Sequence, residues 1–409
     1  MMARTWRVGI VKDTSKPMLG LHALHTAFRG LPDVDVVGHV DSNTENLPEK
    51  MSYTGARRHY LTLADMLDQE PLDIVVLCSR HPYDHLEQIR TAAEAGCHIY
   101  CEKPLSASLR EADEIVELAE RYQIRICAAH PSRYHLPFLT MKRMVEAGEI
   151  GQPVTIYGRG KNDHRGGGED LIVLGTHILD LQTFFFGAPE YVYADITADG
   201  RPISRTDRAE TVEPIGPAAG DSVFALFRFP GDVRGVFESK RGLAGKAPGA
   251  IYMGITVIGT EGALSMRFND SGSSESSLRV SRHPGPPEDA TCYEEVPLTE
   301  DRVIPGAEPL DYSLCGQPDI PKAKFFLETT RFAVWDLMRA IEEDRQPVSN
   351  VYNARLAVEM ICGIYAAHLS GSRITFPLKD RRHPLGECGE MDTRRSGSVS
   401  SRNNLEGGG

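Results

Sequence analysis

With 409 residues, of which 41% are apolar and 25% charged, the chain is long enough to form two domains with hydrophobic cores. Its formal net charge of -12 at pH 7 and its pI near 5.6 exclude a protein that mainly binds nucleic acid, because a phosphate-binding surface needs an excess of basic residues. No apolar run approaches the roughly 18 residues of a membrane span, so we expect a cytoplasmic protein with no membrane partner.

The first third of the chain alternates strand-like and helix-like segments, the pattern of a parallel sheet covered by helices. Ser108 and Glu111 have the spacing of a helix-capping box, so a helix is expected to follow residue 108. Strands are expected at residues 8–11, 34–40, 73–78, 98–101 and 125–128, and further helices at 19–31, 63–68 and 83–95.

After about residue 150 the apolar residues alternate with a period of two, as in 223–229 and 254–259, which predicts a largely antiparallel sheet. The helix-like segment 172–186 is expected to cover one face of that sheet. Residues 267–320 read as loops and irregular strands. Helices are expected at 322–344 and 353–370, and the second is expected to pack back on the first domain.

These patterns predict a domain over residues 1–128, a second domain over 129–380, and a disordered tail over 386–409, part of which has the composition of an added tag. The eight cysteines are scattered, several of them within apolar stretches, and are expected to be reduced and buried. Cys97 and Cys101 have neither a short chelating spacing nor a matching second pair, so no metal site is expected.

A strand, turn and helix at the start of the chain, followed by Asp41 at the end of the next strand, is the layout of a dinucleotide site. The carboxylate of Asp41 can accept both ribose hydroxyls, and its charge would repel a 2′-phosphate, which favours NAD over NADP. An ordinary turn aspartate is an equally good interpretation of this residue taken alone.

The phosphate loop of that layout is atypical, because no glycine lies between Gly9 and Gly20. Glycines normally let backbone amides approach the pyrophosphate. The groups that can compensate are the charges of Lys12 and Lys16, the hydroxyls of Thr14 and Ser15, and a helix opened by Pro17. The alternative is a closed loop that binds nothing.

Glu102-Lys103-Pro104 directly follows a predicted buried strand, at the edge where open α/β sheets hold their ligands. In its order of strand, tripeptide, capped helix and strand, the chain resembles the Gfo/Idh/MocA oxidoreductases over residues 7–380. The resemblance implies that Lys103 lies between nicotinamide and substrate, and that the bond from Lys103 to Pro104 is often cis. The alternative is a surface lysine in a salt bridge. Other segments that carry the resemblance are His85, Gly96-Cys97-His98, Gly148-Glu149-Ile150-Gly151 and Gly259-Thr260-Glu261-Gly262.

The segment 166–180 resembles the second catalytic motif of that family, in which His177 corresponds to the general acid/base. An imidazole can exchange the proton that must accompany hydride transfer at a C–OH carbon, and Lys103 would stabilise the developing alkoxide. The alternative is a structural histidine at a helix start. Val173 stands where many relatives carry an aspartate, and Asp170, Asp180 or His164 could take over its role.

The residue patterns and the resemblance together assign residues to three groups. Lys103 and His177 are expected to be catalytic. Substrate contacts are expected from Asp180, His164, His130 and Arg133, the last two having a structural role as their alternative. Cofactor contacts are expected from Lys12, Thr14, Ser15, Asp41, Ser79, His81, His85, Glu102 and Lys103.

The fold class expected is therefore α/β, with an N-terminal Rossmann-type doubly wound parallel sheet and a C-terminal α/β domain containing a large, mostly antiparallel open sheet. The function expected is NAD-dependent hydride transfer to or from a secondary hydroxyl or carbonyl of a sugar, cyclitol or related polyol, in a homodimer or homotetramer formed through the open sheet. One alternative is a redox-neutral lyase or glycosidase that retains NAD and works through a keto-sugar. A second is a sensor or binding protein of the same fold without cofactor or catalysis.

Overall fold

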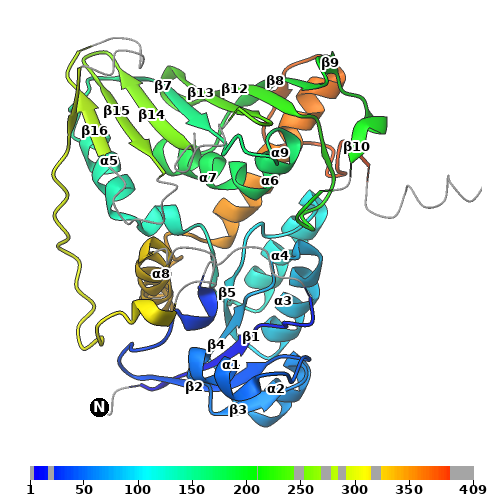
Figure 1. Cartoon of the computed structure of the whole chain (residues 1–409), viewed down its shortest axis with the longest axis vertical. Coiled ribbons are helices and arrows are strands. Elements are labelled where there is room, and N and C mark those ends of the chain that lie inside the picture. The colour runs from blue at the N-terminus through cyan, green and yellow to red at the C-terminus, as the bar shows by residue number, and fades with distance from the viewer. Residues whose placement is uncertain are drawn as a thin grey trace, which may run out of the picture.

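The computed structural model describes residues 4–16, 23–209, 211–243, 253–268, 278–283, 292–314 and 324–386. Two β-sheets organise these residues, one of six strands and one of ten. In Figure 1 the larger sheet lies above the smaller one. The smaller sheet is parallel and the larger is mostly antiparallel, so the predicted α/β fold class is confirmed.

The six-stranded sheet has the order β3-β2-β1-β4-β5-β6, and all its neighbouring strands are parallel. The strand order reverses between β1 and β4, and in such sheets ligands bind in the crevice at the carboxyl ends of those strands. The strands are β1 (Trp6–Val11), β2 (Val34–Val40), β3 (Arg58–Tyr60), β4 (Ile74–Leu77), β5 (His98–Cys101) and β6 (Ile126–Ala128).

Three of the helices predicted for this part of the chain form as expected. The Ser108 side chain accepts a hydrogen bond from the Glu111 amide and so caps the helix after residue 108. The helix α1 and the short strand β3 were not predicted. The helices are α1 (Leu47–Thr54), α2 (Leu63–Gln69), α3 (His85–Glu94) and α4 (Leu109–Arg121), with a 3-10 turn η2 (Pro82–Asp84) before α3.

The helix predicted at 19–31 is wrong over its described part. From Ala23 onward the chain forms only the 3-10 turn η1 (Leu24–Thr26) and further turns. Ala23 has a left-handed backbone with φ of 55° and Gly30 has φ of 69°, so the backbone cannot continue a right-handed helix at either point. The predicted role of Pro17 in opening that helix falls on a residue outside the described ranges.

Two helices from the end of the chain cover the six-stranded sheet. Val334 and Leu337 of α8 (Lys324–Glu342) pack in one apolar cluster with Val8 and Ile10 of β1. Figure 1 shows α8 beside this sheet, although it is the C-terminal part of the chain that supplies it. The helix α9 (Val351–Ser370) contacts α4 and β6 on the other face and then runs on to the second sheet.

The ten-stranded sheet follows the path β17-β16-β15-β14-β7-β13-β12-β8-β18, with β9 paired to β8. Only β7 and β13 pair in parallel among these strands as described. The strands are β7 (Pro153–Arg159), β8 (Tyr191–Ala198), β9 (Arg201–Pro202), β12 (Ser222–Phe229), β13 (Val233–Lys240), β14 (Gly254–Gly259), β15 (Ala263–Arg267), β16 (Leu278–Ser281), β17 (Tyr293–Glu295) and β18 (Ile374–Thr375), and β10 (Arg208–Ala209) pairs separately with β11 (Ala218–Ala219).

One face of the large sheet is covered by helices, as predicted for the segment 172–186. These helices are α5 (Leu136–Glu146), α6 (Gly168–Val173), α7 (Gly175–Phe186) and the end of α9. On the opposite face Tyr193 and Phe224 are each 47% exposed. None of the helices in the described part of the chain is both long and apolar enough to cross a lipid bilayer.

Candidate active site

Lys103 lies at the carboxyl edge of the parallel sheet, directly after β5. The bond from Lys103 to Pro104 is cis, as the family resemblance implies. The Glu102 carboxylate accepts a hydrogen bond of 2.8 Å from the Lys103 amide. Lys103 is only 2% exposed, and its Nζ donates a hydrogen bond of 2.6 Å to the carbonyl oxygen of Val173. The lysine is therefore buried and directed toward the second domain, which excludes the surface salt-bridge interpretation.

The surroundings of Lys103 favour loss of its proton near neutral pH. Its pKa is lowered to about 7, first by burial and then by the positive charge of Arg80, against the opposing charges of Glu102 and Glu213. A buried lysine whose pKa lies near 7 can both donate a hydrogen bond and exchange a proton.

Val173 stands where many relatives carry an aspartate, and it contacts Lys103 through its backbone rather than its side chain. The side chain is buried in the core of the second domain, whereas the carbonyl oxygen accepts the hydrogen bond from Lys103. Val173 ends α6, and His177 lies one turn further on, in the first turn of α7. Lys103 thus contacts the helix junction that carries His177.

His177 is 5% exposed and packs against His130, with ring centroids 5.7 Å apart and an interplanar angle of 86°. The preceding glycines allow this segment to lie against the sheet. A Cβ at Gly166 would come within 2.3 Å of the Arg241 backbone, and Gly168 would meet the Ala219 carbonyl at 2.2 Å. The glycine run therefore has a packing function beside the predicted catalytic motif.

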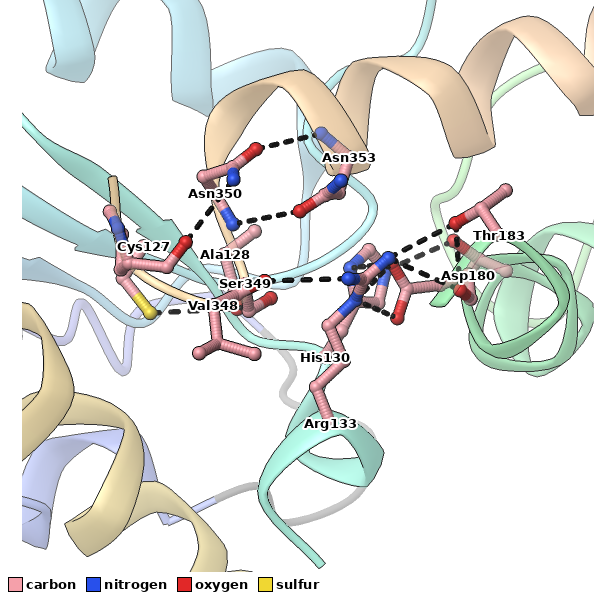
Figure 2. A network of polar contacts seen from close by, with 12 residues as sticks. Cys127, Ala128, His130, Arg133, Asp180, Thr183, Val348, Ser349, Asn350 and Asn353 are labelled. Atoms are coloured by element: carbon pink, nitrogen blue, oxygen red, sulfur yellow. Dashed lines mark hydrogen bonds and ion pairs between the residues drawn. The ribbon is translucent and has the colours of Figure 1, made fainter. Parts of the chain in front are cut away.

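His130, Arg133 and Asp180 form one buried network (Figure 2). The His130 ring of this network contacts the His177 ring. The Asp180 carboxylate accepts hydrogen bonds of 3.0 and 2.9 Å from Arg133 Nε, and Arg133 also reaches the Asp180 carbonyl and the Thr183 hydroxyl. His130 Nδ1 lies 3.5 Å from the Asp180 carboxylate. Burial lowers the pKa of His130, so its ring is neutral at pH 7. The network fixes the loop after β6 to α7.

The two other candidates for substituting the aspartate lie in different surroundings. Asp170 is buried; it accepts hydrogen bonds from the Ser239 hydroxyl and the Asn162 amide, and burial raises its pKa. The His164 side chain is 71% exposed, and its nitrogen lies 4.0 Å from Asp163. The structure therefore gathers Lys103, His130, Arg133, His177 and Asp180 together and leaves His164 at the surface.

Asp41, the predicted ribose acceptor, is completely buried at the end of β2. Its Oδ1 accepts hydrogen bonds of 2.9 Å from the amides of Thr14 and Asn43. Its Oδ2 accepts from the Thr14 hydroxyl at 2.7 Å and lies 2.9 Å from Lys50 Nζ. Burial opposes its ionisation, but these hydrogen bonds outweigh burial and hold the pKa of Asp41 below its ordinary value. The Asp41 carboxylate is therefore ionised, and its hydrogen bonds hold Thr14 in the loop after β1 and Asn43 in the segment after β2.

The remaining residues predicted to contact cofactor lie around the crevice between β1 and β4. Lys12 is largely buried, which lowers its pKa, and the Ser15 amide donates to Asp13. The Ser79 hydroxyl donates to Asp84. The His85 ring lies between the carbonyls of Ser79 and Leu105 and thereby fixes the loop after β4.

A cavity of about 300 Å³ opens at this crevice, between the ends of β1 and β4. Three buried polar atoms on its lining residues have no hydrogen-bond partner in the described part of the chain: Arg80 Nε, His81 Nε2 and Gln88 Oε1. Buried polar groups are normally paired, so these three atoms are unusual. The cavity also lies where the strand order of the parallel sheet reverses, which makes this crevice the candidate ligand site.

Sequence reasoning missed three residues of this region. Arg80 pairs with the buried Glu213, which also accepts a hydrogen bond of 2.5 Å from Arg165. Arg80 was within reach of prediction, because its neighbours Ser79 and His81 were both predicted. Glu213 and Lys50 carry no comparable signal, since neither lies at a predicted strand end.

Two models of one family match the chain. Residues 18–130 match the model described as "Oxidoreductase family, NAD-binding Rossmann fold", and residues 138–265 match the GFO/IDH/MocA C-terminal domain. Together the two ranges cover more than half of the 409 residues.

Among curated proteins, the chain is similar to the myo-inositol 2-dehydrogenase of Thermotoga maritima, at 25% identity over 206 residues, which are 49% of this chain and 59% of the relative. It is also similar to the D-apiose dehydrogenase of Paraburkholderia graminis, at 28% identity over 201 residues, which are 46% of this chain and 51% of that protein. The chain thus spans about half the length of the curated relatives that it matches.

Solved structures support the same fold over most of the chain. An oxidoreductase from Agrobacterium radiobacter in complex with NAD+, L-tartaric acid and magnesium has a TM-score of 0.67 at 15% identity, over 90% of this chain and 98% of that one. Levoglucosan dehydrogenase in complex with NADH and levoglucosan also has a TM-score of 0.67, at 20% identity, over 91% of this chain and 100% of that one. With both family models matching in order along the chain, this protein belongs to the Gfo/Idh/MocA family of NAD-binding oxidoreductases.

Proposed function

We propose that this protein transfers hydride between the nicotinamide of a bound NAD and a secondary hydroxyl or carbonyl carbon of a sugar, cyclitol or related polyol. The observation that carries the proposal is the buried Lys103 ammonium, which lies at the carboxyl edge of the parallel sheet and contacts the helix junction that carries His177.

The position of the crevice between β1 and β4, where the strand order of the parallel sheet reverses, supports a dinucleotide site. The cavity there is lined by polar side chains, among them Arg80, His81 and Gln88, which suit a ligand rich in hydroxyl and amide groups. The nicotinamide ring would accept or return the hydride when the cofactor is bound. Lys103 lies on the sheet edge next to this crevice, where substrate and ring must meet.

The roles of Lys103 and His177 follow from the balance of the reaction. When a secondary alcohol is oxidised, its C–H bond breaks and both electrons leave with the hydride, while the O–H proton passes to a base. His177 accepts that proton, and Lys103 hydrogen-bonds the same oxygen and stabilises its developing negative charge. In the reverse direction His177 returns the proton to the oxygen.

The proposed role of the buried network is to position His177. The network consists of Asp180, His130 and Arg133. The Asp180 carboxylate is already engaged by Arg133, and the His130 ring stands edge-on to that of His177. The network therefore limits the orientations open to His177. The sugar-like substrate class is supported by the relatives whose names are inositol and apiose dehydrogenases.

We also propose that the chain forms a homodimer or homotetramer through the open face of the large sheet. Tyr193 and Phe224 lie on adjacent strands of that face and are the large apolar side chains that it exposes there. Phe224→Glu should convert the oligomer into a smaller species in light scattering. A protein that is already monomeric, or an unchanged mass, would contradict this interface.

The catalytic proposal is tested by offering the purified protein NAD and a panel of cyclitols, aldoses and polyols, and following both NADH and the oxidised product. Lys103→Ala should lower kcat by about 100-fold to 1,000-fold while NAD affinity changes little. Lys379→Ala is the matched control, because Lys379 is an exposed lysine that follows α9 and β18.

Three results would contradict the proposal in different ways. Near wild-type turnover of Lys103→Ala would remove the lysine from the reaction. Product without accumulation of NADH would favour the redox-neutral lyase or glycosidase. The absence of both turnover and dinucleotide binding would favour a sensor or binding protein.

A further inference from the structure

The carboxylate of Asp41 has no acceptor capacity left for a ligand. A carboxylate offers about four lone-pair positions. Four protein donors take them: the amides of Thr14 and Asn43, the Thr14 hydroxyl and Lys50 Nζ, all between 2.7 and 2.9 Å. Asp41 is 0% exposed, so a ribose diol could reach it only by displacing Thr14 or Lys50.

Lys50 neutralises Asp41 as well as binding it. It projects from α1, and its Nζ also donates hydrogen bonds of 2.7 Å to the Thr14 hydroxyl and the Asn43 carbonyl, which hold it in place. An acid at this position repels a 2′-phosphate only while its charge is uncompensated. Here an ammonium stands 2.9 Å from the carboxylate.

Three other titratable side chains near Asp41 are those of Asp13, Lys12 and His39. Asp13 is a second carboxylate, bonded to the Ser42 hydroxyl, and Lys12 is a second ammonium whose charge acts on both Asp41 and Lys50. His39 Nε2 lies 3.8 Å from Asp41, but burial lowers the pKa of His39 to about 4, so its ring is neutral at pH 7. The nearest charge to the Asp41 carboxylate is therefore the Lys50 ammonium, which compensates the negative charge that would otherwise repel a 2′-phosphate.

We infer that Lys50 is a specificity-determining residue that removes the selectivity against a 2′-phosphate, so that the crevice binds NADP about as well as NAD. This inference rests on the proposed dinucleotide function. It replaces the sequence-based expectation of a preference for NAD, which depended on a free Asp41 carboxylate. In this interpretation Asp41 fixes the loop after β1 through Thr14 and does not hydrogen-bond the ribose hydroxyls.

The test is calorimetric binding of NADH and NADPH to the full-length protein. Wild type should bind the two with dissociation constants within about fivefold of each other. Lys50→Met leaves the buried carboxylate without its counter-charge and should weaken NADPH by at least about tenfold relative to NADH. Lys50→Arg keeps the charge and should keep the wild-type ratio.

A double variant separates charge from simple damage to the loop. Asp41→Asn in the Lys50→Met background removes the repelling charge, so the NADPH to NADH ratio should return toward wild type even where both affinities fall. Thermal unfolding of each variant checks that it is folded.

Two results would overturn the inference alone: wild type that rejects NADPH by about 100-fold or more while binding NADH, or an unchanged ratio in Lys50→Met. A protein that binds neither dinucleotide would overturn the proposed function and this inference with it.

Discussion

At the scale of single residues, the site replaces a missing side chain with a backbone group. Lys103 needs an acceptor for its ammonium, and the Val173 carbonyl supplies one at 2.6 Å. A carbonyl carries no net charge, so it leaves the pKa of Lys103 lower than a carboxylate in the same place would. The sequence pointed to Lys103 and to the valine at position 173, but not to the hydrogen bond between them. That bond depends on α6 ending at Val173, where the carbonyl oxygen is free to accept it.

The Arg133–Asp180 pair gives the clearest residue-scale prediction. Both side chains are buried, so Asp180→Asn leaves the Arg133 charge without compensation and should lower the free energy of unfolding by about 3–5 kcal/mol. Asp380→Asn is the matched control. It breaks an exposed pair with Arg382 and should cost at most about 1 kcal/mol. Urea unfolding measures both, and equal losses in the two variants would show that the buried pair does not stabilise the fold.

Residue identity alone could predict some roles and not others. The strand-end positions of Asp41 and Lys103 were recognisable, because motif spacing places them at the edge of a parallel sheet. The hydrogen bonds that Asp41 makes were not recognisable. They involve Thr14 and Lys50, which contact Asp41 only after the loop and α1 have folded.

At the scale of elements, strong local patterns were reliable and weak ones were not. The capping residue Ser108 and the apolar face behind it specify α4 locally. The segment 19–31 also contains apolar residues at helical spacing, but over its described part the left-handed Ala23 and Gly30 close turns instead. The apolar face that covers this side of the sheet comes from α8, and periodicity within a helix does not say which sheet the helix will cover.

The packing of α8 on the six-stranded sheet can be tested with Leu337, which is fully buried against that sheet. Leu337→Ala should lower the free energy of unfolding by about 2–5 kcal/mol and raise hydrogen exchange in β1. Arg339→Ala, on the exposed side of α8 with surface partners Glu342 and Glu343, should cost at most about 1 kcal/mol. Faster exchange confined to α8 itself would contradict the packing.

At the scale of the whole molecule, α8 and α9 join the end of the chain to its beginning. The helix α9 crosses from the parallel sheet to the large sheet, and its buried Glu359 holds Arg355, Arg381 and the Leu378 amide. The site between the sheets is therefore supported from both ends of the sequence. Hydrophobic patterning predicted both sheets, whereas these long-range contacts depend on three-dimensional packing that no local pattern encodes.

The partly buried His98 and the buried His383 predict loss of stability in acid. Burial lowers the pKa of His98 and of His383 to about 4, and each ring accepts a hydrogen bond at Nδ1 from a backbone amide. Because the unfolded chain binds these protons near pH 6.5 and the folded chain does not, stability is lost as the pH falls from about 6.5 toward 4.

Urea unfolding at about pH 7.5 and about pH 5 should therefore differ by up to a few kcal/mol, and His98→Gln should reduce the difference. Equal stability of wild type at the two pH values would show that these histidines do not control the acid response.

The proposed function depends on a dinucleotide in the crevice between β1 and β4, with its nicotinamide next to Lys103. A crystal structure of the protein with NADH tests it most directly. We expect the nicotinamide ring between the Lys103 ammonium and the crevice, with room for a substrate oxygen to contact both Lys103 and His177. A nicotinamide bound away from Lys103, or a crevice that stays empty at saturating NADH, would contradict it.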